Sequence, residues 1–149
     1  MSIKTKAKIV LEDEKENGIR AILNYGHTYG HAIEALSNFK DILHGEAVLL
    51  GMLKATNMSY FSSQGQLCWE ERTEIEDIIV SMIKKFNPNL LSKKYNLTKF
   101  KRSMMGDKKV KSGKLNLVLI NSIGSAFVTD SFLESDLDLS IEIMQANFP

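Results

Sequence analysis

The feature of the sequence that most constrains the fold is a long apolar segment near the middle of the chain. From Gly45 to Phe61, apolar residues follow one another almost continuously. A helix that is hydrophobic on nearly all sides has to be buried on most of them. The segment is shorter than the roughly 20 residues that a membrane-spanning helix needs. We therefore expect a central buried helix that other elements surround.

The rest of the chain supplies elements to cover this helix. Apolar residues at helical spacing predict further helices at residues 6–11, 19–37, 70–86, 98–105 and, starting at Ser135 or Asp136, up to Ile143. Strand-like residues 115–120 and 126–128 flank a turn at 121–124 and predict a hairpin. The predicted fold class is mainly α with one small β-hairpin, and the 149 residues form a single domain.

Composition excludes several classes of function. The formal net charge is +1, which gives no electrostatic reason to expect nucleic acid or an anionic membrane as a partner. The only cysteine is Cys68, so the chain has no disulfide framework and no cysteine-based zinc site. The first residues lack the apolar stretch of a signal peptide. We expect a cytoplasmic protein.

The histidines are the strongest candidates for chemistry, because all three lie in one short stretch. His27 and His31 are four residues apart, which places them on one face of a helix, and His44 precedes the buried segment. Neutral imidazole is a frequent ligand of zinc, although ordinary core or surface histidines also occur at this spacing. Glu34 and Glu46 are candidates for orienting these rings. Gly26 and Gly30, which precede two of the histidines, permit close approach of backbone or ligand.

A second group of residues is cationic. Lys6, Arg20, Lys108 and Lys109 are candidates for binding an anion, and Asn24 lies one helical turn from both Arg20 and His27. Each of these cations, taken singly, is more often a solvated surface charge. The lysine-rich run 108–114 does not have the spacing of a phosphate-binding P-loop.

Two motifs give the sequence a strong resemblance to a known family. Residues 20–35 read RAILNYGHTYGHAIEA, and residues 43–48 read LHGEAV. With the upstream lysines and acids, and with the Asp-Lys-Lys of residues 107–109, this order resembles the 3-dehydroquinate synthase family over nearly the whole chain.

The resemblance implies a lyase of the shikimate pathway, which leads to the aromatic amino acids. Such an enzyme converts 3-deoxy-D-arabino-heptulosonate 7-phosphate into 3-dehydroquinate and phosphate, with NAD and Zn²⁺ or Co²⁺ as cofactors, and it acts as a homodimer. The resemblance implies that His27 and His44 bind the metal and that the catalytic residues are His31, Lys108 and Asn24. The implied substrate-binding residues are Lys6, Glu16, Arg20, Asn24, His31 and Lys108.

Two parts of the family pattern are missing from the sequence: the NAD-binding domain and the third zinc ligand that the resemblance implies, a Glu upstream of the matching region. The chain has no Gly-rich nucleotide loop, so residues 1–149 are expected to form the C-terminal metal- and substrate-binding helical domain without the NAD-binding N-terminal domain. We expect such a fragment to be inactive alone. The alternatives are another sugar phosphate cyclase of the valiolone or deoxy-inosose type, a polyol dehydrogenase of the same architecture, and a non-catalytic helical interaction domain derived from such an enzyme.

Overall fold

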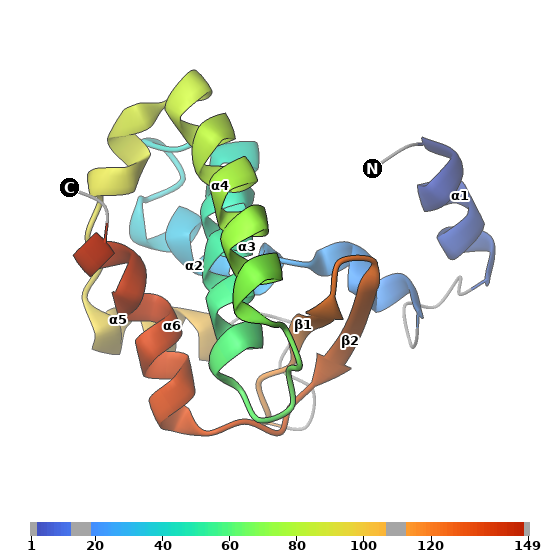
Figure 1. Cartoon of the computed structure of the whole chain (residues 1–149). Coiled ribbons are helices and arrows are strands. Elements are labelled where there is room, and N and C mark those ends of the chain that lie inside the picture. The colour runs from blue at the N-terminus through green and yellow to red at the C-terminus, as the bar shows by residue number, and fades with distance from the viewer. Residues whose placement is uncertain (1–2, 13–18, 107–112, 148–149) are drawn as a thin grey trace.

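A computed structural model of the chain describes residues 3–12, 19–106 and 113–147 (Figure 1). Its elements, in chain order, are α1 (Ile3–Glu12), η1 (Ile19–Asn24), α2 (His27–Leu36), α3 (His44–Phe61), α4 (Trp69–Phe86), η2 (Pro88–Ser92), α5 (Leu97–Met105), β1 (Leu117–Ser122), β2 (Ser125–Thr129) and α6 (Glu134–Asn147). The mainly α fold class with one hairpin is confirmed.

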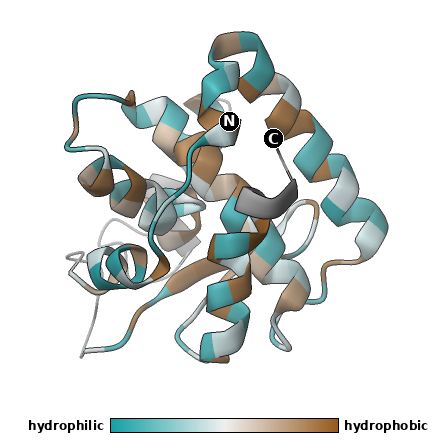
Figure 2. Cartoon of the chain, turned by 90° about the vertical axis from the view of Figure 1, so that its left-hand side faces the viewer, coloured by the Kyte–Doolittle hydropathy of each residue, from teal (hydrophilic) through white to brown (hydrophobic). Residues whose placement is uncertain are grey.

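Helix α3 is the centre of the molecule, as the apolar segment predicts. It contacts α2, α4, α6 and β1, and its residues 50, 51 and 53–59 are all buried. The outer helices are amphipathic, and Figure 2 shows hydrophilic and hydrophobic residues alternating around them. Ile33, Ile83, Phe100 and Ile141 extend from four of these helices into the core around α3.

The crossing of α2 and α3 is unusually close because glycines line it. A Cβ atom on Gly51 would lie 2.0 Å from the carbonyl oxygen of Gly26 and 2.7 Å from the amide nitrogen of Gly30. Gly26 also has a φ of +80°, a left-handed conformation that favours glycine. The single helix predicted over 19–37 is therefore wrong. The chain instead forms η1 and α2, separated at Tyr25 and Gly26.

The C-terminal elements close the other side of α3. Strands β1 and β2 pair antiparallel, with Leu119 opposite Phe127. Helix α6 begins at Glu134, so the predicted start at Ser135 or Asp136 is wrong, and both residues lie within the first turn of the helix. It is joined to the body by two buried hydrogen bonds. The Nζ of Lys54 donates to the Ile141 carbonyl at 2.6 Å, and the hydroxyls of Tyr29 and Ser140 lie 2.8 Å apart.

Helix α1 differs from the other helices in its packing. It contacts η1 and stands apart from the helical body in Figure 1. Two of its apolar side chains, Ile3 and Leu11, are exposed. None of the described helices combines the length and the hydropathy that crossing a bilayer requires.

Candidate metal centre

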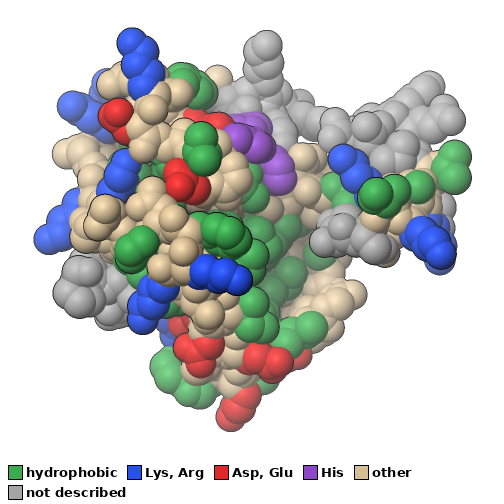
Figure 3. Space-filling model, turned by 90° about the horizontal axis from the view of Figure 1, so that it is seen from above, with side chains coloured by type: hydrophobic (Ala, Val, Ile, Leu, Met, Phe, Trp, Pro, Cys, Tyr) green, Lys and Arg blue, Asp and Glu red, His purple; other side chains and the backbone are tan. Residues whose placement is uncertain are grey.

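The fold brings all three histidines together at one end of the α2–α3 pair. His27 is the first residue of α2 and His31 follows one turn later, while His44 is the first residue of α3. The ring centroids are 5.9 Å apart for His27 and His31, 5.6 Å for His27 and His44, and 6.1 Å for His31 and His44. The histidine side chains form one patch on the surface shown in Figure 3.

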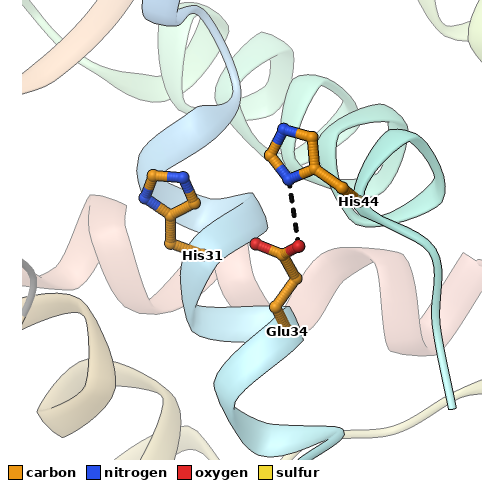
Figure 4. Close-up of side chains that lie close together, drawn as sticks. All are labelled: His31, Glu34 and His44. Carbon is orange, nitrogen blue, oxygen red and sulfur yellow. Dashed lines mark hydrogen bonds and ion pairs between the residues drawn. The ribbon is translucent and has the colours of Figure 1, made fainter. Parts of the chain in front are cut away.

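Glu34 fixes the orientation of one of these rings. Its Oε1 lies 2.9 Å from Nδ1 of His44, and the two side chains point toward each other across the gap between α2 and α3 (Figure 4). The carboxylate is 13% exposed and the imidazole 58%. Because an ionised carboxylate only accepts hydrogen bonds, Nδ1 of His44 is the donor to Glu34. In the neutral ring the free lone pair is then on Nε2, which does not face Glu34. The prediction that Glu34 contacts a histidine is confirmed.

His27 has a similar anchor on its Nδ1, provided by the backbone. Nδ1 lies 3.3 Å from the carbonyl oxygen of Tyr25, which can only accept, so this contact also favours the tautomer with its lone pair on Nε2. The Tyr25 hydroxyl is in turn 2.7 Å from the Thr56 hydroxyl, and burial raises the pKa of this phenol far above its ordinary value of 10.0. Tyr25 is not among the predicted site residues, because it meets His27 through a backbone carbonyl, which no pattern of side chains indicates.

The donor atoms fit a divalent metal ion such as Zn²⁺. One ligand atom each from His31, Glu34 and His44 lie within 4.8 Å of one another, and the ring of His27 is next to them. Imidazole nitrogen and carboxylate oxygen are common zinc ligands. Histidines that bind zinc through one ring nitrogen typically donate the other to a carboxylate or a carbonyl. His27 and His44 both have such a partner on Nδ1.

Glu46 does not orient a histidine, contrary to the prediction. Its Oε2 accepts a hydrogen bond from the Leu43 amide at 2.9 Å, and its Oε1 accepts one from the Asn87 side chain at 3.1 Å. The residue therefore caps the N-terminus of α3 and ties it to the end of α4. This fixes the backbone at His44, so Glu46 acts on the site through the helix.

The structure gives the other predicted site residues different placements. Asn24 ends η1, three residues before His27, and is partly buried. Lys6 is exposed on α1, which stands apart from the histidines' helices. The backbone of Arg20 lies in η1. Glu16 and Lys108 lie outside the described residues.

Comparison with known sequences matches the chain to one family. Residues 1–110 match a family described as 3-dehydroquinate synthase C-terminal. The 3-dehydroquinate synthase of Rippkaea orientalis is 39% identical over 146 residues, and that of Nitrosococcus oceani is 42% identical over 136. These alignments cover 98% and 91% of this chain but 38% and 36% of the relatives, so the chain spans little more than a third of their length.

Two solved enzyme structures have a fold similar to that of this chain. A crystal structure of 2-deoxy-scyllo-inosose synthase, complexed with carbaglucose-6-phosphate, NAD⁺ and Co²⁺, matches with a TM-score of 0.76 at 22% identity. The 2-epi-5-epi-valiolone synthase of Streptomyces hygroscopicus, with NAD⁺ and Zn²⁺ bound, matches with a TM-score of 0.70 at 14% identity. The two structural alignments cover 94% and 95% of this chain, but only 40% of the inosose synthase chain and 37% of the valiolone synthase chain. On the sequence match, supported by this fold, the chain belongs to the 3-dehydroquinate synthase family and corresponds to its C-terminal part.

Proposed function

We propose that this chain is the metal- and substrate-binding part of a 3-dehydroquinate synthase. The whole enzyme would be a phosphate-eliminating carbon–oxygen lyase that converts 3-deoxy-D-arabino-heptulosonate 7-phosphate into 3-dehydroquinate and phosphate. The observation that carries this proposal is the three-histidine cluster at the start of α2 and α3. Identities of 39–42% to named synthases support the choice of reaction.

We propose that His27 and His44 bind the metal through Nε2. The hydrogen bonds from Nδ1 of His27 to the Tyr25 carbonyl and from Nδ1 of His44 to Glu34 support this choice, because they hold each ring in the tautomer that a metal needs. When bound, the ion supplies a Lewis acid for a substrate hydroxyl and the carbonyl formed from it. A direct site of His31, Glu34 and His44 is the competing arrangement.

His31 is proposed to face the substrate. Its ring lies 5.9 Å from that of His27 and 6.1 Å from that of His44, close enough to touch a molecule held at the metal. An imidazole in this place is suited to proton transfer near the departing phosphate. Asn24 and Lys108 are proposed to act with it. Lys6 and Arg20 are proposed to hold the anionic groups of the substrate, with Glu16 supporting these contacts.

The cofactors and setting of the whole enzyme are proposals as well. We propose NAD as the redox cofactor and Zn²⁺ or Co²⁺ as the metal, since the two solved neighbours contain NAD⁺ with Co²⁺ or Zn²⁺. We also propose a cytoplasmic homodimer. Another sugar phosphate cyclase is the second candidate, supported by the fold match, but the identities of 22% and 14% favour it less than those of the synthases.

A chimera tests the proposed reaction. The chain would replace the matching C-terminal part of the Nitrosococcus oceani synthase, and phosphate release from 3-deoxy-D-arabino-heptulosonate 7-phosphate would be measured with NAD⁺ and Co²⁺. We expect turnover that His44→Ala abolishes. A chimera that folds and binds the metal but releases no phosphate from this substrate would contradict the proposal. Turnover of glucose 6-phosphate instead would favour the second candidate.

A further inference from the structure

Tyr25 contacts the histidine cluster through its backbone and the core of the protein through its side chain. Its carbonyl oxygen lies 3.3 Å from Nδ1 of His27, a length at which a small shift of the backbone breaks a hydrogen bond. The next residue, Gly26, has a φ of +80°, and glycine restrains the backbone less than any other residue. The direction of the Tyr25 carbonyl therefore has to be fixed by contacts from outside this turn.

The phenol of Tyr25 provides such a contact. Its oxygen lies 2.7 Å from Oγ1 of Thr56, which is fully buried on α3. Thr56 donates its only hydroxyl proton to the carbonyl of Met52 at 2.7 Å. The phenol must therefore be the donor in the bond to Thr56. Each hydrogen bond from Tyr25 to Thr56 to Met52 thus has a defined direction.

Helix α3 offers the phenol a second acceptor close to the first. Ser59 is fully buried and is also a hydrogen-bond partner of the Tyr25 side chain. Its own hydroxyl proton goes to the carbonyl of Ala55 at 2.7 Å, so toward the phenol Ser59 can only accept. Two buried acceptors on one helix therefore face a single donor, and the phenol is held by α3 whichever of them it uses.

We propose that Tyr25 is a positioning residue for the metal, because its phenol, held on α3, fixes the carbonyl that orients His27. With the carbonyl fixed, the proton stays on Nδ1 and the lone pair of Nε2 is ready for the ion. Thr56 lies twelve residues after His44, about 18 Å along the helix axis, so it acts on the centre through Tyr25. The inference rests on the proposed function, in which His27 is a metal ligand.

NMR of the metal-free chain tests this role, because the nitrogen chemical shifts of an imidazole distinguish its two tautomers. At about pH 8, where histidine is neutral, wild-type His27 should carry its proton on Nδ1, and Tyr25→Phe should show a mixture of tautomers. Calorimetry on the same variant should show zinc affinity lowered about fivefold. Thr56→Val should have a smaller effect, because Ser59 remains as an acceptor, and Thr56→Ser should match the wild type.

Tyr29→Phe is the matched control. The Tyr29 hydroxyl lies 2.8 Å from that of Ser140, which donates to the Leu137 carbonyl at 2.7 Å, so the same chain of bonds recurs between α2 and α6. This variant should lose thermal stability as Tyr25→Phe does, but it should keep the wild-type His27 tautomer and zinc affinity.

Two results would overturn the positioning role while leaving the proposed function intact. One is a Tyr25→Phe protein with the tautomer and the affinity of the wild type, and the other is an equal loss of affinity in Tyr29→Phe. Wild-type affinity in His27→Ala is a different failure. It would show that the proposed ligand is wrong, and the positioning role would be wrong with it.

Discussion

Helix α3 carries a nitrogen base at its start and another in its middle, and the two have opposite surroundings. His44 opens the helix with a ring that is 58% exposed, and its partner is the carboxylate of Glu34. Lys54, ten residues later, is fully buried and donates to a backbone carbonyl of α6. Burial lowers the pKa of the lysine to about 7, from an ordinary value of 10.5.

The difference separates a site from a core contact on the same helix. At His44 the protein has placed an acceptor that orients a base and has left the base open to a ligand. At Lys54 it has placed a base where no ligand can reach, and the side chain joins α6 to α3 and lies 5.5 Å from the Phe100 ring. The first arrangement suits binding, and the second costs stability whenever the amine is charged.

The largest expected effect is on stability and concerns the close crossing of α2 and α3, which positions both His44 and Lys54. Gly51→Ala should destabilise the protein by about 3 kcal/mol or more, because the added methyl group would overlap the backbone of Gly26. Urea unfolding measures the loss. Gly45→Ala is the control, since a Cβ there meets nothing within 4 Å, and it should change stability by less than about 1 kcal/mol. Equal effects of the two substitutions would show that the crossing is not close-packed.

The buried amine makes stability depend on pH. Between pH 7 and about 10 the unfolded chain holds the Lys54 proton more tightly than the folded chain, so the free energy of unfolding should rise with pH across this window. Lys54→Met should flatten that rise and stabilise the protein at pH 6 by about 2 kcal/mol. Urea unfolding at pH 6, 7.5 and 9 measures both effects. The exposed Lys99→Met should keep the wild-type slope, and a Lys54→Met protein that is less stable at pH 6 would refute the cost we assign to the charge.

At His44, removing the negative charge of its hydrogen-bond acceptor, Glu34, should weaken metal binding. Glu34→Gln keeps an oxygen that can accept from Nδ1 of His44 but loses the negative charge, so zinc affinity should fall about tenfold. Calorimetry measures the affinity, with Glu142→Gln on the exposed side of α6 as the control. Complete loss of binding would instead identify Glu34 as a direct ligand.

The smallest expected effect lies in the loop that returns the chain from α2 to His44. Asn38 has a φ of +53°, and the amide of Phe39 after it bonds to the Glu34 carbonyl at 2.9 Å. Asn38→Gly should stabilise the protein by about 0.5 kcal/mol, and Asn38→Ala should destabilise it by about 1 kcal/mol. Thermal unfolding measures both. If both changed stability in the same direction, the left-handed conformation would not be what Asn38 supplies.

The sequence predicts the helices better than it predicts their breaks and contacts. The apolar run 45–61 indicates a buried helix whatever elements pack around it, because its composition alone requires burial. The break at Gly26 is not visible in the periodicity. It depends on the backbone of Met52, which lies so close that a Cβ on Gly26 would be 2.6 Å from its nitrogen.

The same division applies to the site. The spacing of His27 and His31 predicts that they share a helix face, which is local geometry. The contact between Glu34 and His44 joins two helices through a turn whose conformation the sequence does not state. Lys54 within an apolar run is a visible signal of a buried amine, but its partner, the Ile141 carbonyl, lies 87 residues away in the chain.

The measurement that tests the central claim most directly is the zinc affinity of the chain by calorimetry, for the wild type and for three single substitutions. If the rings anchored through Nδ1 are the ligands, His27→Ala and His44→Ala should each lose at least about 100-fold in affinity, and His31→Ala should lose much less. Circular dichroism of each variant checks that its helix content is that of the wild type. A large loss in His31→Ala, with little change in His27→Ala, would contradict the account and favour the site of His31, Glu34 and His44.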